Sequence, residues 1–335
     1  MTALSRSALA RLPKADLHLH LEGAVTPADL RTLYPPSRKP PVARSRFGSM
    51  HRFRGFGGFL RAFGALCGLL QTPEDFGRVA LRLAARLRRQ GVRRAEILVS
   101  LPVHLRRGLS GEALIESILG RREPARRMGI EIGIILDGVR QWGPEALEPC
   151  LRLARRYRAE GVLGIGLGGD EAALPAEPFA SLFREARRAG LHTVLHTGEV
   201  GGPEAVRRDL RALEPERVGH ALRAAEDLRL IDELARRRTP VEVAVTGNWR
   251  TGLLRRRHDH PLDLFLSRGV NVVLAADDPA FFRTTLLDEY ALAQRLCRLS
   301  PARMRSLARA SLQASFGDAP AAGMRRPVAP RVHPP

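Results

Sequence analysis

The chain has 335 residues, of which 44% are apolar and 27% charged, with three cysteines and a formal net charge of +20. It has no apolar run of about 18 residues and no apolar leader, so we expect neither a membrane helix nor a secretion signal. None of the cysteines is in a C-x-x-C pair, which fits reduced thiols in the cytoplasm. Nearly all the basic residues are arginines spread over the polar faces of Ala/Leu-rich segments, as codon bias produces, so charge alone predicts no nucleic acid partner.

Eight short apolar runs alternate with segments of helical period. The predicted strands are Ala15–His20, Ala95–Ser100, Ile132–Asp137, Val162–Leu167, His192–His196, Arg217–His220, Val241–Val245 and Val270–Ala275. Helical periodicity is clearest over Glu74–Gln90 and Glu145–Glu160. Most runs are apolar on both faces, as parallel strands are, and the alternation predicts an α/β fold of the (β/α)8 TIM barrel type. We expect one barrel domain over residues 1–316.

Two segments interrupt this rhythm. Residues 35–58 are rich in Pro, Arg and Gly and predict an irregular insertion after the first barrel helix, and residues 317–335 form a Pro/Arg-rich tail that we expect to be disordered. Within the insertion, Phe47 and Phe53 lie among arginines and could stack on nucleic acid bases. The interpretation we prefer is that these rings pack on the barrel.

Titratable residues gather at the ends of the predicted strands. His18 and His20 close the first run, and their period-two spacing makes both rings project from one face. His196 and His220 end the fifth and sixth runs, and Asp277 follows the eighth. Barrel enzymes assemble their sites at the carboxyl ends of the strands, and imidazole is a common zinc ligand. Because scattered core histidines would show no such preference, the group predicts a metal site.

Five motifs follow one another along the chain: HLHLEG at 18–23, GGDE at 168–171, HTGE at 196–199, GH at 219–220 and DDP at 277–279. This order, with 24 residues from His196 to His220 and 57 from His220 to Asp277, resembles the adenosine deaminase family of the amidohydrolase superfamily. The resemblance covers roughly residues 11–300 and is more specific than any single motif. It implies a zinc hydrolase that converts an adenine-type ring into the 6-oxo purine and ammonia.

The resemblance also implies individual roles. One Zn²⁺ per chain would leave a position open for water and be bound by His18, His20, His196 and Asp277. His220 would orient the hydroxide, Asp277 could receive its proton, and Glu199 would protonate N1 of the purine. The residues implied to contact the substrate are Glu22, His20, Phe59, Phe63, Gly169 at N3 and Asp278 at N7.

Some of these side chains have structural alternatives. Glu199 could be a helix N-terminal acid favoured by the helix dipole, although its place three residues after His196 favours catalysis. Asp170 and Glu171 are expected to be mainly structural supports of the site, and Asp16 is expected to be structural as well.

The phenylalanines of the implied substrate site also have two interpretations. Phe59 and Phe63 have the i, i+4 spacing of a helix face packed on the core. In the family that the chain resembles, such a segment forms an apolar lid over the substrate.

Three features bear on the substrate. At the position of Glu22, adenosine deaminases typically have an Asp that contacts the ribose 5′-hydroxyl. A glutamate there resembles adenine deaminases and some deaminases of nucleoside derivatives. Trp249–Gly252 and Phe282–Leu286 resemble the nucleoside deaminases, whereas Val245–Asn248 departs from the family and leaves open the contacts made from the seventh strand. We therefore expect adenosine first, aminodeoxyfutalosine second and adenine third.

Two other classes of function are alternatives to this one. A basic nucleic-acid-binding protein on a barrel scaffold would account for the +20 charge, but the H-x-E…P-C-x-x-C signature of deaminases that act within nucleic acids is absent. A barrel hydrolase with a different leaving group is the other alternative, and Glu199 and the Asp277–Asp278 pair favour a purine ring only through the resemblance.

Overall fold

The computed structural model describes residues 3–49 and 52–317. The predicted tail therefore lies, apart from Gly317, outside the described residues. Within these residues, no helix is long and apolar enough to cross a membrane.

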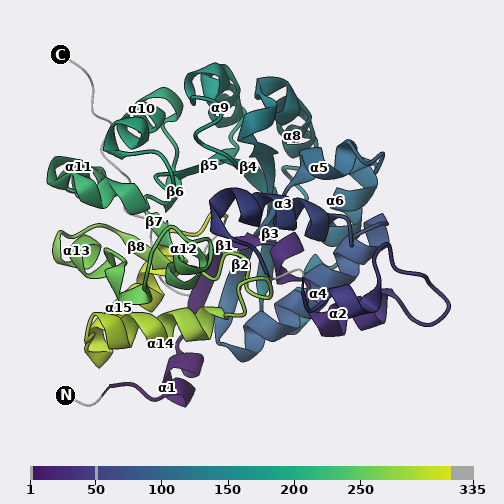
Figure 1. The fold of residues 1–335 in the computed structure, drawn as a ribbon, viewed down its shortest axis with the longest axis horizontal. Helices are drawn as coiled ribbons and strands as arrows, with labels where there is room; N and C mark the ends of the chain where they lie inside the picture. The colour runs from purple at the N-terminus through teal and green to yellow at the C-terminus, as the bar shows by residue number, and fades with distance from the viewer. Residues whose placement is uncertain (1–2, 50–51, 318–335) are drawn as a thin grey trace.

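Eight parallel strands pair in sequence order and confirm the predicted (β/α)8 barrel (Figure 1). They are β1 (Lys14–His20), β2 (Val92–Val99), β3 (Glu131–Val139), β4 (Val162–Gly168), β5 (His192–Thr197), β6 (Arg217–His220), β7 (Val241–Val243) and β8 (Val272–Leu274). The barrel closes just beyond β8, where Asp277 pairs with Leu19 of β1 in a single parallel bridge.

The helices surround the strands, as Figure 1 shows. They are α1 (Arg6–Arg11), α2 (Pro27–Leu33), α3 (Gly55–Cys67), α4 (Pro73–Arg89), α5 (Leu101–Leu105), α6 (Gly111–Leu119), α7 (Arg122–Arg127), α8 (Pro144–Arg156), α9 (Ala180–Arg188), α10 (Pro203–Leu213), α11 (Leu228–Arg237), α12 (Val245–Arg250), α13 (Leu262–Ser267), α14 (Leu286–Leu296) and α15 (Pro301–Gln313). Short 3₁₀ turns lie at η1 (Glu22–Ala24), η2 (Arg44–Arg46), η3 (Arg140–Trp142), η4 (Glu177–Phe179), η5 (Leu222–Glu226) and η6 (Arg257–Asp259).

Two predicted strands are longer than the observed ones. The seventh ends at Val243 rather than Val245, because the chain turns into α12 there, and the eighth narrows to Val272–Leu274. The predicted helices over Glu74–Gln90 and Glu145–Glu160 are α4 and α8, and α8 ends early, at Arg156. The predicted insertion contains η2 and, from Gly55, the first residues of α3.

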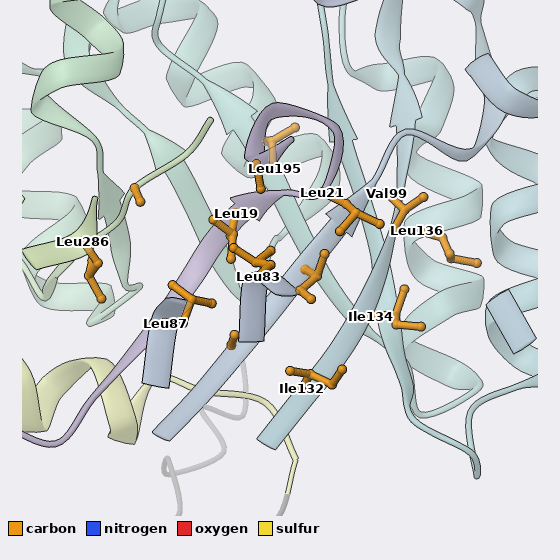
Figure 2. Close-up of a cluster of buried hydrophobic side chains, with 14 of the residues drawn as sticks. Leu19, Leu21, Leu83, Leu87, Val99, Ile132, Ile134, Leu136, Leu195 and Leu286 are labelled. Carbon is orange, nitrogen blue, oxygen red and sulfur yellow. The ribbon is translucent and has the colours of Figure 1, made fainter. Parts of the chain in front are cut away.

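Alternating side chains of the strands fill two separate layers. On β3, Ile132, Ile134 and Leu136 lie in the layer between strands and helices, together with Leu83 and Leu87 of α4 (Figure 2). Burying each such side chain contributes about 1.5–3 kcal/mol to the free energy of unfolding. The opposite face of β3 points into the barrel, where a separate cluster consists of Leu98, Ile135, Val194 and Phe316. Phe316, beyond the last helix, thus closes the interior of the barrel.

Candidate active site

His18 and His20 lie at the carboxyl end of β1, held against the segment that follows β8. The backbone N–H of His20 donates to the carbonyl of Asp277 at 3.0 Å, and the N–H of Asp277 donates to the carbonyl of His18 at 2.9 Å. Asp277 itself has a left-handed backbone, with φ of 62°. This backbone pairing brings the Asp277 carboxylate to the same place as the two imidazoles.

Four side chains converge on one point with their ligand atoms. The Nε2 atoms of His20 and His196 are 3.2 Å apart, and Oδ1 of Asp277 lies 3.7 Å from Nε2 of His18 and 3.6 Å from Nε2 of His20. Nε2 of His18 is buried and has no hydrogen-bond partner among the described residues. The ligand atoms of His18, His20 and His196 lie within 4.8 Å of one another, and so do those of His18, His220 and Asp277. Imidazoles and a carboxylate form a donor set that fits Zn²⁺, so these residues could hold such an ion.

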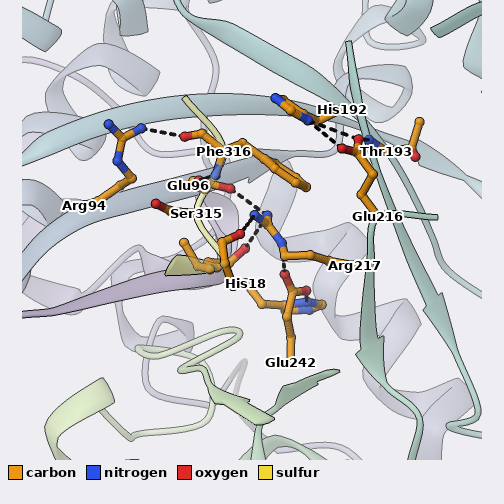
Figure 3. A network of polar contacts seen from close by, with 12 residues as sticks. His18, Arg94, Glu96, His192, Thr193, Glu216, Arg217, Glu242, Ser315 and Phe316 are labelled. Atoms are coloured by element: carbon orange, nitrogen blue, oxygen red, sulfur yellow. Dashed lines mark hydrogen bonds and ion pairs between the residues drawn. The ribbon is translucent and has the colours of Figure 1, made fainter. Parts of the chain in front are cut away.

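Burial sets the protonation of the histidines. Desolvation, followed by the charges of neighbouring histidines, lowers the pKa of His18, His20 and His220 well below the usual value, and desolvation lowers the pKa of His196 to about 4. The rings are therefore neutral near pH 7, which is the form that binds metals. In addition, Oε2 of Glu242 on β7 lies 2.7 Å from Nδ1 of His18 and fixes the orientation of this ring (Figure 3).

Glu199 lies in the loop between β5 and α10. Its Oε1 is 3.7 Å from Nε2 of His220, and only 7% of the residue is exposed. Burial, with smaller contributions from Asp277 and Glu171, raises its pKa well above the usual range. Because α10 begins only at Pro203, Glu199 is not in the first turn of a helix, and the helix-dipole interpretation finds no support.

The two aspartates after β8 are also buried carboxyls. Burial and the charge of Glu289 raise the pKa of Asp277 to about 7, and burial together with Asp277 raises the pKa of Asp278 well above its usual value. A hydrogen bond between the two carboxyls also raises the pKa of Asp278 and lowers that of Asp277. Asp278 is thus a buried acid that lines the cavity beside Asp277.

A cavity of about 150 Å³ joins these groups. One side is polar and is formed by His20, His196, Glu199, His220, Asp277 and Asp278. The opposite side is apolar and comes from one face of α3, with Phe56, Phe59, Leu60 and Phe63. The predicted lid pair, Phe59 and Phe63, therefore lines the cavity, and Phe59 also packs on Phe281 and Phe282 beneath it. The remaining walls follow β2, β3 and β4.

The other predicted substrate residues differ in their position. Gly169 lines the cavity with φ of 105°. Glu22 is fully buried and is not among the lining residues, and its Oε1 accepts from the backbone N–H of Ser100 at 3.0 Å and contacts Nε2 of His104 at 2.8 Å. Oε2 of Glu22 has no hydrogen-bond partner among the described residues, so the contact of Glu22 with the substrate stays a prediction. Through Oε1 the carboxylate positions Ser100, which does line the cavity.

The expected supporting acids lie outside the cavity. Glu171 accepts the backbone N–H groups of Gly198 at 2.7 Å and Gly201 at 2.9 Å, and it also accepts that of Val200. It therefore ties down the loop that carries Glu199. Asp16 is buried and accepts the N–H of Ala276 at 3.3 Å.

The phenylalanines of the insertion pack on the barrel, which is the interpretation preferred from the sequence. The ring of Phe53 stacks on Phe281 with centroids 5.3 Å apart, and Phe47 is buried in the main core.

Sequence reasoning missed two residues beside the histidines. Glu242 was hidden inside a short apolar run. Asn248 lies in the segment that departs from the family, and its Nδ2 is 3.2 Å from Nδ1 of His220 while its Oδ1 is 3.3 Å from Nε2 of His260. His220 has φ of 66°, so its ring is presented from a strained backbone that this contact helps to hold. Neither residue stands at a strand end, since Glu242 is the middle residue of β7 and Asn248 lies in α12, so the pattern that found the histidines gave no signal for them.

Comparisons with known proteins agree with this geometry. The family model described as adenosine deaminase matches residues 13–326. An aminodeoxyfutalosine deaminase of Streptomyces avermitilis is 37% identical over 322 residues, which cover 93% of this chain and 89% of the relative. An adenine deaminase of Chelativorans sp. is 34% identical over 311 residues, which cover 92% of this chain and 94% of the relative.

Solved structures show the same architecture. An adenine deaminase from Arthrobacter aurescens superimposes with a TM-score of 0.84 at 27% identity, covering 91% of this chain and 94% of the other. An amidohydrolase from Burkholderia ambifaria with bound Zn gives a TM-score of 0.84 at 25% identity, covering 95% of this chain and 89% of the other.

Proposed function

Because the chain belongs to the adenosine deaminase family, whose members are hydrolytic deaminases acting on C–N bonds, we propose that it removes the 6-amino group of an adenine-type ring with the help of one zinc ion. The observation that carries the proposal is the convergence of the His20 and His196 Nε2 atoms, 3.2 Å apart, on the Asp277 carboxylate at the rim of one cavity. The same cavity is lined by Glu199 and Asp278, two buried acids placed to face a substrate.

The zinc ion would be held by His18, His20, His196 and Asp277. When bound, it supplies the Lewis acidity that makes water a nucleophile near neutral pH. The neutral imidazoles match this role, since protonated rings could not bind a cation. Glu242 keeps Nδ1 of His18 engaged, so that Nε2 is the nitrogen left to bind.

The remaining groups would act on the water and the purine. His220 holds the attacking water, and Asp277 accepts its proton. Glu199 donates a proton to N1, which makes C6 electrophilic, and its raised pKa favours the protonated form that this role requires. Water adds to C6 as its proton passes to Asp277. Asp277 then gives this proton to N6, the C6–N6 bond breaks, and ammonia leaves. The hydroxyl proton of the intermediate returns to Glu199, which leaves the 6-oxo purine and restores both carboxyl groups to their starting state.

The ring would be oriented by two further contacts. Protonated Asp278 donates to N7, in keeping with a pKa that burial raises, and the backbone N–H of Gly169 donates to N3. The phenylalanines of α3 cover the ring and exclude bulk water, which strengthens each of these hydrogen bonds.

For the substrate, the order expected from the sequence is revised. None of the relatives described above is named for adenosine, whereas aminodeoxyfutalosine and adenine deaminases are 37% and 34% identical to this chain. We therefore place aminodeoxyfutalosine first and adenine second. The position of Glu22, bonded to Ser100 and His104 and away from the cavity, fits a sugar-binding wall that differs from the one expected for adenosine.

The test is a spectrophotometric panel with zinc-loaded protein and four substrates: aminodeoxyfutalosine, adenine, adenosine and deoxyadenosine. We expect turnover with release of ammonia, and highest kcat/KM for aminodeoxyfutalosine. Zinc-loaded protein that deaminates none of them would refute the reaction, and highest kcat/KM for adenosine would refute only the choice of substrate. Protein that binds no zinc at all would refute the mechanism.

A further inference from the structure

A buried carboxyl that the proposed reaction does not use lies at the carboxyl end of β3. Asp137 lines the same cavity as Glu199 and Asp278, although only 3% of the residue is exposed. Its Oδ1 has no hydrogen-bond partner among the residues that the structure describes. A buried polar atom without a partner costs free energy, so a native site that keeps one usually provides it for a ligand.

The strand order fixes which edge of a purine this carboxyl would face. In the proposed function, on which this inference rests, the contacts to N1, N3 and N7 come from Glu199, Gly169 and Asp278, after β5, β4 and β8. Along the perimeter of the purine, starting at C6, the nitrogen atoms follow in the order N1, N3, N9 and N7, so N9 lies between N3 and N7. The matching arc of the barrel runs from β4 back to β8 through β3, β2 and β1. On this arc, Asp137 after β3 and Ser100 after β2 line the cavity.

Glycines on β4 make the room for this carboxyl. A Cβ atom on Gly166 would lie 2.4 Å from Oδ1 of Asp137, and one on Gly168 would lie 2.9 Å from Oδ2. Any other residue at these two positions would force the carboxyl to move. Gly138, Val139 and Trp142, which follow Asp137 in the chain, also line the cavity.

We infer that Asp137 is a specificity-determining residue that accepts a hydrogen bond from a donor on the N9 side of the purine. In a nucleoside this donor is a hydroxyl of the sugar, and in free adenine it is N9–H. Burial raises the pKa of Asp137 well above its usual value, as it does for Glu199 and Asp278, but a protonated carboxyl keeps a carbonyl oxygen that accepts an O–H or an N–H. Substrates without such a donor leave the buried oxygen unpaired and are rejected, as in other sites built around a polar contact.

The experiment compares Asp137→Ala and Asp137→Asn with the wild type on four ligands: adenosine, 2′,3′,5′-trideoxyadenosine, adenine and 9-methyladenine. The first and third carry a donor on the N9 side, and the second and fourth are their matched partners without it. Values of kcat/KM are measured where turnover occurs, and competitive inhibition constants otherwise. Zinc content is measured for every variant, and Asp232→Ala, an exposed carboxylate paired with Arg268, is the control.

We expect Asp137→Ala to lower kcat/KM, or weaken inhibition, by about tenfold or more for the ligands that carry the donor and by less than about threefold for their partners, with zinc content unchanged. Asp137→Asn keeps a carbonyl acceptor and should retain part of the discrimination. A loss confined to adenosine identifies a sugar hydroxyl, and a loss confined to adenine identifies N9–H.

An equal loss for all four ligands, or no loss for any, overturns the inference. Failure of the proposed function would be visible separately, because the wild type itself would then neither deaminate nor bind any of these purines.

Discussion

The buried ion network under the proposed zinc site gives the sharpest prediction (Figure 3). Arg217 on β6 is fully buried, and its guanidinium lies 2.6 Å from Glu96 on β2 and 2.6 Å from Glu242 on β7. The change Arg217→Met removes the charge while keeping an apolar chain of similar length. It leaves two buried carboxylates without a cation, which costs about 3–5 kcal/mol. This is a large part of the roughly 5–15 kcal/mol by which a domain is stable.

The pH dependence of this cost separates lost charge pairing from lost packing. Burial raises the pKa of Glu96 and of Glu242, and the charge of Arg217 opposes that rise. Without Arg217 both folded-state pKa values increase further, so the folded variant binds more protons than its unfolded chain. The penalty is therefore largest above the raised pKa values and shrinks as the pH falls towards the unfolded values.

The assay is urea denaturation of metal-free protein at about pH 7.5 and about pH 5.5, where the difference in protonation should appear. We expect Arg217→Met to lose about 3–5 kcal/mol at the higher pH and at least about 1 kcal/mol less at the lower one. Arg236→Met, on an exposed face of α11, should change stability by less than about 0.5 kcal/mol. A penalty below about 1 kcal/mol at the higher pH, or one that is independent of pH, would refute the reasoning.

Three further predictions concern the site. The Glu199→Gln variant should keep its zinc, as measured by metal analysis, and its kcat should fall about 10²–10⁴-fold. Wild-type kcat/KM should fall as the pH rises through the raised pKa of Glu199, because this acid must be protonated. A variant that stays active would exclude Glu199 as the acid. Glu242→Gln should weaken zinc binding about 10–100-fold in chelator competition, since it orients His18, and unchanged affinity would contradict that role. Removal of the metal with a chelator should abolish turnover and lower the urea midpoint, and added zinc should restore both; activity that survives complete removal would rule out the zinc mechanism.

The barrel and the strand-end residues that converge in the structure could be predicted from the sequence for a common reason. Parallel strands buried on both faces leave apolar runs that are visible in one dimension, and every barrel strand delivers its last residues to the same face. A histidine at such an end, such as His196, is therefore placed in space by its position in the chain. The strand ends near Val243 and Leu274 were harder to place, because the apolar runs continue into turns and into α12.

The hydrogen bonds and ion pairs that support the proposed ligands cannot be predicted from strand ends in this way. They join residues of different strands, and the sequence does not reveal the register between those strands. Glu242 has the same neighbours in the sequence as a core residue, yet it links His18 to Arg217, whose guanidinium lies 3.6 Å from the ring centroid of Phe316. The backbone N–H of Phe316 in turn donates to Glu96. A continuous set of buried contacts thus runs from the residue that closes the barrel interior to a proposed zinc ligand. Because each link is desolvated, loosening Phe316 weakens the hold on Glu96 and Arg217, and through Glu242 it reaches the orientation of His18.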